Sequence, residues 1–294
     1  MAETKPEPLY AHLIKSMPVK KGPGGANAEE LIWMFGNELE GLNINFALGR
    51  YKGTGLWHPW AGPHVHPTYN ECLVFFGHDT NNLNYLGAEF ELALGKEQEK
   101  HVFDTPVIVT LPAGLPHCPL VTNRIDKHFS HGHIILGPDD PTDWWPIDSK
   151  PIETTGSEYS HLIKPINVNK APVGTNAKEL TWMMSDQLEG FNLNFALGIC
   201  EETGQWYEGH KAHVHPYDSI MIFFGQDANS LGYLGAELEI SLGKEYEKHT
   251  FNVPTVVVIP RGLPHLPLIV NRVDNPFSFI LYDLGPKHEA LWVD

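Results

Sequence analysis

The sequence predicts an all-β protein made of two tandem domains, each a β-barrel or jelly roll. Short runs such as residues 90–95 (FELALG) and 238–243 (LEISLG) roughly alternate large apolar residues with polar or small ones, which is the period of a strand with one buried face. The 27 glycines and 24 prolines of the 294-residue chain supply turns between many such strands, and helical periodicity is rare. The two halves also repeat one another, which predicts two copies of one domain.

The internal repeat can be followed along most of the chain. Residues 43–49 (NINFALG) return as 192–198 (NLNFALG). Residues 115–117 (LPH) return as 263–265 with an offset that is one residue shorter. One residue is therefore missing from the second copy, and the alignment places the loss just after Pro216.

Composition suggests where the predicted parts begin and end. Residues 1–140, with a leading segment, form the predicted N-terminal domain, and 161–294 form the C-terminal domain. The stretch between them, 141–160, is rich in proline, acidic and hydroxyl residues without apolar periodicity, as expected of a linker. Residues 27–31 and 176–180 resemble single capped turns that precede a strand.

Charge and composition disfavour several classes of partner. The chain has 20 Lys plus Arg against 36 Asp plus Glu, a formal charge of -16 that would repel nucleic acid or an anionic membrane. Residues 1–10 carry three charged side chains and two prolines, unlike a secretion leader, and the longest apolar runs are too short to span a bilayer. Cys72, Cys118 and Cys200 show no clustered spacing, which fits a reducing compartment, so we expect a cytoplasmic protein.

Six of the 17 histidines occupy equivalent places in the two halves. His64 and His66 are two residues apart on a predicted strand, so both imidazoles project from one face and can reach one ion. A third imidazole is offered by His117, which follows a proline- and glycine-containing turn at 112–116. The second half repeats the pattern with His213, His215 and His265.

This pattern resembles the cupin superfamily, whose first motif is H-x-H followed a few residues later by Glu, and whose second is P-x-G-x-x-H with an Asn soon after. The positions that match the metal ligands of that family in the first half are His64, His66, Glu71 and His117. Asn123 lies slightly beyond the usual place of the closing Asn, and Asn271 is its equivalent. The resemblance covers residues 40–136 and 189–285, so the chain is similar to a bicupin, with two tandem double-stranded β-helix domains.

The second half departs from the family pattern at one position. His213, His215 and His265 match the ligand positions, but Ser219 aligns with Glu71 and Asp218 is only a neighbour. A site with three histidines and no carboxylate would hold an ion more weakly or with more water. We therefore expect the first half to be the active one.

Three neutral imidazoles and one carboxylate suit a borderline divalent ion such as Mn, Fe, Co, Ni or Zn, and they leave positions open for substrate or water. One ion is expected in the first domain, with a further site available in the second. Glu71 has two roles open to it, metal ligand and general base.

Other repeated residues have plainer interpretations. Four histidines that recur without ligand spacing are expected to be hydrogen-bonded packing residues: His12, His101, His161 and His249. Trp57 and Trp206 precede the first motif, and they either line the mouth of a pocket or belong to the core.

The sequence leaves three classes of function open. The first is a metalloenzyme acting on a small oxygen-rich substrate such as a phenol, enol, 1,3-dicarbonyl or keto acid. For such a metalloenzyme, the resemblance favours dioxygenase cleavage slightly over a redox-neutral hydrolase, lyase or isomerase reaction. The second is a non-catalytic bicupin that binds a ligand or stores nitrogen, and the third is a bicupin whose metal is purely structural. Exposed sheet edges would also allow a homodimer.

Overall fold

The computed structural model describes residues 8–22, 27–51, 53–57, 62–144, 158–207, 211–227 and 230–293. The expected linker at 141–160 and the opening segment at 1–10 fall partly outside these residues. In the first repeat the structure contains η1 (Ala11–Leu13), β1 (Ile14–Ser16), β2 (Lys20–Lys21), β3 (Ala28–Met34), η2 (Gly36–Glu38), β4 (Asn45–Tyr51), β5 (Gly55–Leu56), β6 (His64–Val65), β7 (Glu71–Gly77), β8 (Ala88–Leu94), β9 (Glu99–Phe103), β10 (Val107–Leu111), β11 (His117–Ile125), β12 (Phe129–Ile135) and β13 (Asp143–Trp144).

The second repeat has the same order of elements. They are η3 (Ser160–Leu162), β14 (Ile163–Pro165), β15 (Asn169–Lys170), β16 (Ala177–Met183), η4 (Ser185–Gln187), β17 (Asn194–Cys200), β18 (Gly204–Gln205), β19 (His213–Val214), β20 (Ser219–Gly225), β21 (Ala236–Leu242), β22 (Glu247–Phe251), β23 (Thr255–Ile259), β24 (His265–Val273), β25 (Phe277–Asp283) and β26 (Leu291–Trp292). The helices among the described residues are single 3₁₀ turns, and none of them could cross a lipid bilayer.

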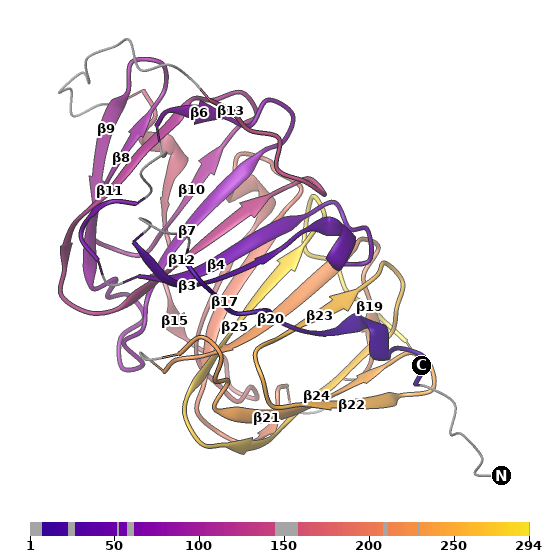
Figure 1. Cartoon of the computed structure of the whole chain (residues 1–294). Helices are drawn as coiled ribbons and strands as arrows, with labels where there is room; N and C mark the ends of the chain where they lie inside the picture. The colour runs from indigo at the N-terminus through magenta and orange to yellow at the C-terminus, as the bar shows by residue number, and fades with distance from the viewer. Residues whose placement is uncertain are drawn as a thin grey trace.

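Each repeat folds into two antiparallel sheets that enclose a barrel interior (Figure 1). In the first repeat one sheet has the order β10-β7-β12-β4-β3-β2, and the other has the order β13-β6-β11-β8-β9 with β5 beside β11. The second repeat uses β23-β20-β25-β17-β16-β15 and β22-β21-β24-β19-β26, with β18 beside β24. The predicted all-β fold of two tandem jelly-roll domains is confirmed.

The two repeats exchange their first strands. Strand β1 pairs with β23 of the second repeat, and β14 pairs with β10 of the first, so each larger sheet has seven strands. Tyr10 and Tyr159, just before these strands, lie over Gly243 and Gly95, where an added Cβ would come within 2.3 Å of the tyrosine ring. Both glycines also have φ near +75°, a backbone conformation that other residues rarely adopt. Glycine at these two positions therefore allows each exchanged segment to lie against the other repeat.

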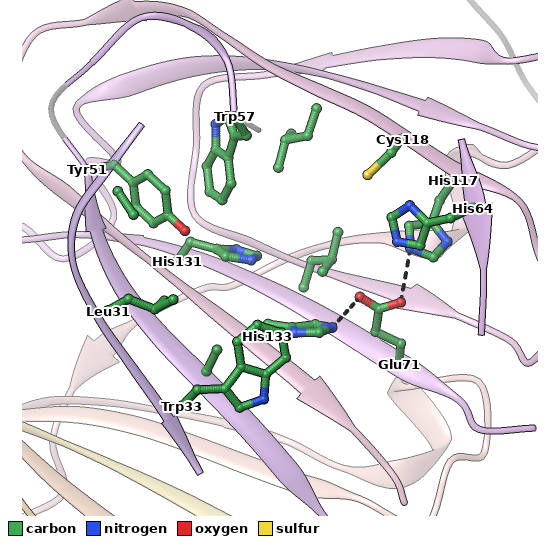
Figure 2. Close-up of a pocket in the computed structure, with 14 residues that line it drawn as sticks. Leu31, Trp33, Tyr51, Trp57, His64, Glu71, His117, Cys118, His131 and His133 are labelled. Carbon is green, nitrogen blue, oxygen red and sulfur yellow. Dashed lines mark ion pairs between the residues drawn. The ribbon is translucent and has the colours of Figure 1, made fainter. Parts of the chain in front are cut away.

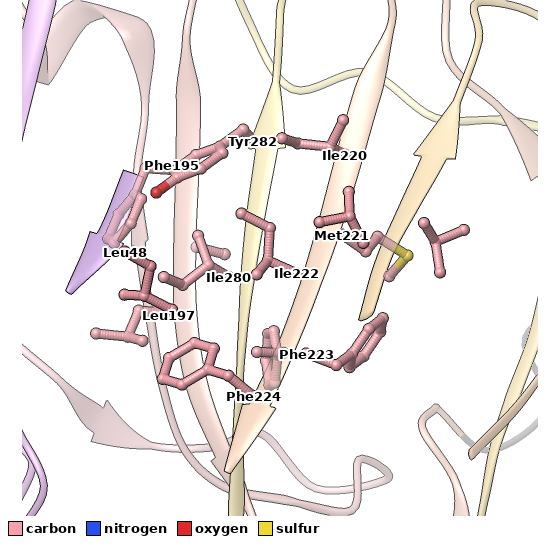
Figure 3. Close-up of a cluster of buried hydrophobic side chains, with 14 of the residues drawn as sticks. Leu48, Phe195, Leu197, Ile220, Met221, Ile222, Phe223, Phe224, Ile280 and Tyr282 are labelled. Carbon is pink, nitrogen blue, oxygen red and sulfur yellow. The ribbon is translucent and has the colours of Figure 1, made fainter. Parts of the chain in front are cut away.

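Strand β7 is buried on both faces, which explains its unbroken apolar sequence. Leu73 and Phe75 pack inside the first barrel, whereas Val74 and Phe76 belong to a cluster that is continuous with the core of the second repeat. The Phe76 ring lies 5.8 Å from Phe224, its counterpart in the second repeat. Figure 3 shows the second-repeat side of this cluster. Burial of each such phenylalanine contributes about 1.5–3 kcal/mol, so the two domains are held together mainly by apolar contact.

The capped turns expected at 27–31 and 176–180 are wrong. Strand β3 begins at Ala28 and pairs with β4, and β16 repeats this at Ala177. Asn27 is not a helix cap, because its side-chain amide donates to the carbonyl of Gly55 at 3.0 Å. Pairing with a long neighbouring strand outweighs the local capping signal here.

Candidate metal centres

The first cluster of histidines forms where two distant stretches of chain meet. His64 in β6 pairs directly with His117 at the start of β11, and His66 follows β6. The ring centroids of His64 and His117 are 4.3 Å apart, and that of His66 lies 5.3 Å from His64 and 5.4 Å from His117. One nitrogen of each ring lies within 4.8 Å of one nitrogen of the others. This spacing allows all three to contact a single ion.

Glu71 completes the cluster from the first position of β7 (Figure 2). Its Oε2 lies 3.1 Å from His117 Nε2 and 3.2 Å from His66 Nε2. These three atoms are buried and make no hydrogen bond of good geometry with the described residues. Buried polar atoms normally have partners, so three that face one another without any suggest a missing group between them.

Contacts at Nδ1 of each ring determine which nitrogen atom points into the cluster. Nδ1 of His64 lies 3.1 Å from the carbonyl of Gly62, and Nδ1 of His117 lies 3.1 Å from that of Leu115. His66 Nδ1 lies 2.9 Å from the Asp140 carboxylate. With the proton on Nδ1, each ring directs its Nε2 lone pair inward, as in metal-binding histidines. Three lone pairs and a carboxylate repel one another unless a cation lies between them, so these residues fit a divalent metal.

The pKa shifts of His64 and Glu71 agree with this charge pattern. Burial and the nearby His117 lower the pKa of His64 to about 4. Burial alone would raise the pKa of the Glu71 carboxyl, but His117 and His133 hold it well below its ordinary value. Burial lowers the pKa of His66, yet its hydrogen bond to Asp140 and the charge of Glu71 outweigh that effect and raise the pKa overall. Glu71 is therefore ionised at neutral pH.

His133 is a functional candidate that the sequence analysis missed. It lies on β12, and its Nε2 is 2.8 Å from Glu71 Oε1, on the side of the carboxylate away from His117. The signal was a second H-x-H pattern, His131 and His133, but it has no copy in the other repeat, where Phe279 and Leu281 stand. Asn123, by contrast, lies on the surface and donates to Glu89 at 3.3 Å, away from the cluster.

A cavity of about 210 Å³ opens beside the first cluster, and the three-histidine group contributes His64 and His117 to its wall. It is lined by Ala28, Leu31, Trp33, Ala47, Tyr51, Trp57, His64, Glu71, Leu73, His117, Cys118, Leu120, His131 and His133. Trp57 is both core and cavity wall, since it is only 7% exposed. Its indole donates to Thr122 at 2.7 Å, which fixes the ring.

The second repeat builds a matching cluster. His213 pairs with His265, and the ring centroids of His213, His215 and His265 are 4.3 to 5.0 Å apart. Nδ1 of His265 lies 3.1 Å from the carbonyl of Leu263, and Nδ1 of His215 lies 2.7 Å from that of Glu289. Both rings are thus held in the same orientation as their first-repeat counterparts.

The second half does have a carboxylate near its histidines, although none was expected from the sequence. Ser219 does take the place of Glu71, but its hydroxyl donates to the fully buried Asp283 at 2.7 Å. Asp283 stands directly opposite Ser219 on β25, and it also accepts a hydrogen bond from His288 Nδ1 at 2.7 Å. His215, Asp283 and His288 form a second group of potential ligands that sequence comparison did not reveal.

The cavity of the second repeat is larger and more apolar at its far end. Its volume is about 500 Å³. The lining residues are Leu180, Trp182, Met184, Trp206, Tyr207, His213, His215, Met221, His265, Leu266, Phe279, Leu281, His288, Ala290 and Trp292. Trp206, which is 5% exposed, is again both core and wall.

Fold and paired clusters together define a bicupin architecture, and solved structures match it over nearly the whole chain. A variant of Bacillus subtilis oxalate decarboxylase matches with a TM-score of 0.64 at 11% identity, over 95% of this chain and 79% of that chain. Lactobacillus farciminis oxalate decarboxylase in complex with formate matches with a TM-score of 0.63 at 12% identity, over 95% and 88%. A structure of the Bacillus subtilis enzyme described for its Mn(II) centres matches at 0.62 and 10%, over 95% and 79%.

No protein-family model matches the sequence, and no curated protein does. The structural likeness therefore establishes the bicupin fold, which confirms the resemblance seen in the motifs.

Proposed function

We propose that the protein is a metal-dependent enzyme whose active centre lies in the first repeat. The proposed ligands of one divalent cation (Mn, Fe, Zn, Co or Ni) are His64, His66, Glu71 and His117. The observation that carries this proposal is the set of buried Nε2 and carboxylate atoms that face one another without hydrogen-bond partners. The Mn(II) centres of the Bacillus subtilis oxalate decarboxylase support manganese as the first metal to test. A second cation would bind His213, His215 and His265.

The proposed reaction is a redox-neutral one, such as a lyase or hydrolase step on a keto acid, enol or 1,3-dicarbonyl. A bound cation would act as a Lewis acid that polarises a carbonyl of the substrate. Glu71 is ionised and lies at the cavity wall, so its carboxylate could accept a proton from the substrate when it is not bound to the cation. His133, 2.8 Å from Oε1, can hold that carboxylate in position and stabilise its charge. The oxalate decarboxylase neighbours, which share this fold, support the redox-neutral reading.

Dioxygenase cleavage, which the motifs alone placed slightly ahead, stays a prediction. It differs from the proposed reaction in one measurable way, because it consumes molecular oxygen. Oxygen uptake with a panel of phenols, diketones and keto acids, repeated under argon, separates the two reactions. Turnover without net oxygen uptake supports the redox-neutral enzyme, whereas uptake of one molecule of oxygen for each substrate converted replaces it with a dioxygenase.

The test of the metal centre is elemental analysis with matched variants. The protein is purified without added metal, ions are counted per chain, and the count is repeated for His66→Ala and His215→Ala. We expect His66→Ala to lose one ion and all turnover, and His215→Ala to lose any second ion while turnover persists. Loss of turnover only in His215→Ala would move the active centre to the second repeat.

A further inference from the structure

The far end of the first cavity holds a buried histidine that the proposed chemistry does not use. His131 is 7% exposed and lines the cavity, and Figure 2 shows its ring directed from the strand into the enclosed space. Its ring packs edge-on against Trp57, with centroids 4.6 Å apart, and lies 4.8 Å from Phe75. Its Nδ1 is buried and makes no hydrogen bond of good geometry with the described residues. The backbone of Val74 is a weaker polar neighbour of the ring. The imidazole is thus held in place mainly by apolar contacts, without a well-formed hydrogen bond at Nδ1.

A second buried polar atom belongs to the same cavity wall. Trp33 Nε1, which can only donate, also has no partner among the described residues. A buried polar atom without a partner costs free energy, and in a cavity wall such an atom is a place where a ligand can gain a hydrogen bond. The remaining orphaned atoms of this cavity belong to the metal cluster. Trp33 packs edge-on against His133, which contacts Glu71, so it lies beside that cluster, and His131 is the polar group farther from it (Figure 2).

The second repeat indicates that the barrel does not need these polar groups in order to fold. His131 aligns with Phe279, which packs against Trp206 at a centroid distance of 4.1 Å, as His131 packs against Trp57. The same strand pair therefore accepts an apolar ring of similar size at this position. Packing therefore does not require a histidine at this position of the first repeat.

The cavity wall also restricts the charge and size of the ligand. Among the described lining residues there is no lysine or arginine, and the aromatic side chains Trp33, Tyr51 and Trp57 form much of the surface. A carboxylate at the far end of the ligand would have no cationic partner, in a space that already contains the ionised Glu71. A volume of about 210 Å³ is below the usual range of drug-sized sites, so the ligand is small.

We infer that the first cavity takes a small, neutral, planar enol, of which a phenol is a stable analogue, with a second oxygen at its opposite end, and that His131 binds this far oxygen. This inference rests on the proposed function for the near end of the ligand, which is held at the metal cluster. His131 is then a specificity-determining residue. It selects for a hydrogen-bonding group at the far end and against an apolar one, while the cavity as a whole selects against a dicarboxylate.

The test is isothermal titration calorimetry under argon on the metal-containing protein, with hydroquinone as the probe. The matched ligand is 4-methylphenol, in which a methyl group replaces the far hydroxyl. We expect hydroquinone to bind about tenfold more tightly, as one satisfied buried hydrogen bond predicts. Equal affinity for hydroquinone and 4-methylphenol in the wild-type protein overturns the inference without any variant.

The matched variant is His131→Phe, which installs the residue that the second repeat already uses. We expect the preference for hydroquinone to disappear while the affinity for 4-methylphenol changes less than about twofold. Phe279→Leu, in the second cavity, should leave the preference intact. If this variant lost the preference, the ligand would bind in the second repeat, and the inference would be wrong. A preference retained in His131→Phe also overturns the inference.

The two proposals fail in different ways. Metal-dependent turnover in a protein that shows no preference for hydroquinone overturns the role of His131 and leaves the enzyme standing. A protein that binds no metal, yet prefers hydroquinone through His131, overturns the metal-dependent function and leaves the far-end contact standing.

Discussion

Glu71 and Asp283 are carboxylates on opposite members of the same strand pair in the two repeats. Glu71 lies on β7 opposite Ile135 of β12, whereas Asp283 lies on β25 opposite Ser219 of β20. Residues directly opposite on antiparallel strands project from the same face, so both carboxylates reach a barrel interior. Each repeat has thus retained a buried acid at its histidine cluster, but from a different strand and with a different neighbour.

The difference predicts separate effects for the two acids, beginning with Glu71→Gln. The amide keeps the shape of the side chain but removes the charge that faces His117 and His133. We expect turnover to fall by about a hundredfold or more, because both the proposed ligand and the proposed base are lost. The folded structure, followed by circular dichroism, should be retained. Ser219→Ala is the matched control in the second repeat, and full turnover in Glu71→Gln would contradict the role given to the acid.

Asp283→Asn is expected to act on stability and on the second centre only. Asp283 is fully buried and accepts hydrogen bonds from Ser219 and His288, so loss of its charge should lower the free energy of unfolding by about 1–3 kcal/mol. Urea unfolding measures this change. Turnover at the first centre should change less than about twofold, since that centre is in the other barrel. A loss of turnover as large as that of Glu71→Gln would show that the second repeat is catalytic.

The site residues that could be predicted are those that lie close together in the sequence or follow a recognisable turn. His64 and His66 are two residues apart, and His117 follows a recognisable turn, so their convergence could be expected. His133 and Asp283 come from the last long strand of each barrel, and they reach the clusters through cross-strand register. Register depends on which strands pair across long stretches of chain, and neither motif nor repeat contains that information.

Local signals and long-range strand pairing also differ in how far they predict the fold. Alternating runs and the internal repeat were enough to predict two all-β domains. They could not predict the exchange of β1 and β14, because each is a three-residue strand whose partner lies in the other repeat. Nor could local signals at Asn27 reveal a strand, since the pairing of β3 with β4 decides its conformation.

Removal of the metal is expected to abolish turnover and to leave the fold intact. The described core consists of two apolar clusters. One contains Phe75 and lies inside the first barrel, and the other contains Phe76 and continues between the barrels. Their packing does not depend on an ion. After treatment with a chelator, far-ultraviolet circular dichroism should be unchanged, and turnover should return on addition of Mn²⁺. Collapse of the spectrum on chelation would instead support a structural metal.

Acid should weaken the protein partly through His78, which connects the two repeats. His78 Nδ1 lies 2.7 Å from Gln226 Oε1, and its Nε2 lies 2.6 Å from the Ser130 hydroxyl. Gln226 is the equivalent residue in the second repeat, so this contact joins corresponding positions of the two domains. Burial lowers the pKa of His78 from 6.5 to about 4, despite the hydrogen bond to Gln226 that opposes the shift. The folded protein therefore keeps His78 neutral where the unfolded chain would protonate it.

The sign of the pH effect follows from this depressed pKa. The contribution of His78 to stability is complete above about pH 6.5 and is lost as the pH falls from there towards 4, because the unfolded chain takes up a proton that the folded protein excludes. Each pKa unit is worth about 1.4 kcal/mol, which sets an upper limit of about 3 kcal/mol on the loss. Urea unfolding at pH 7 and pH 5 measures it. His78→Gln, which copies the second repeat, should show a smaller difference between the two pH values than the wild-type protein, and an identical difference would remove His78 as a cause.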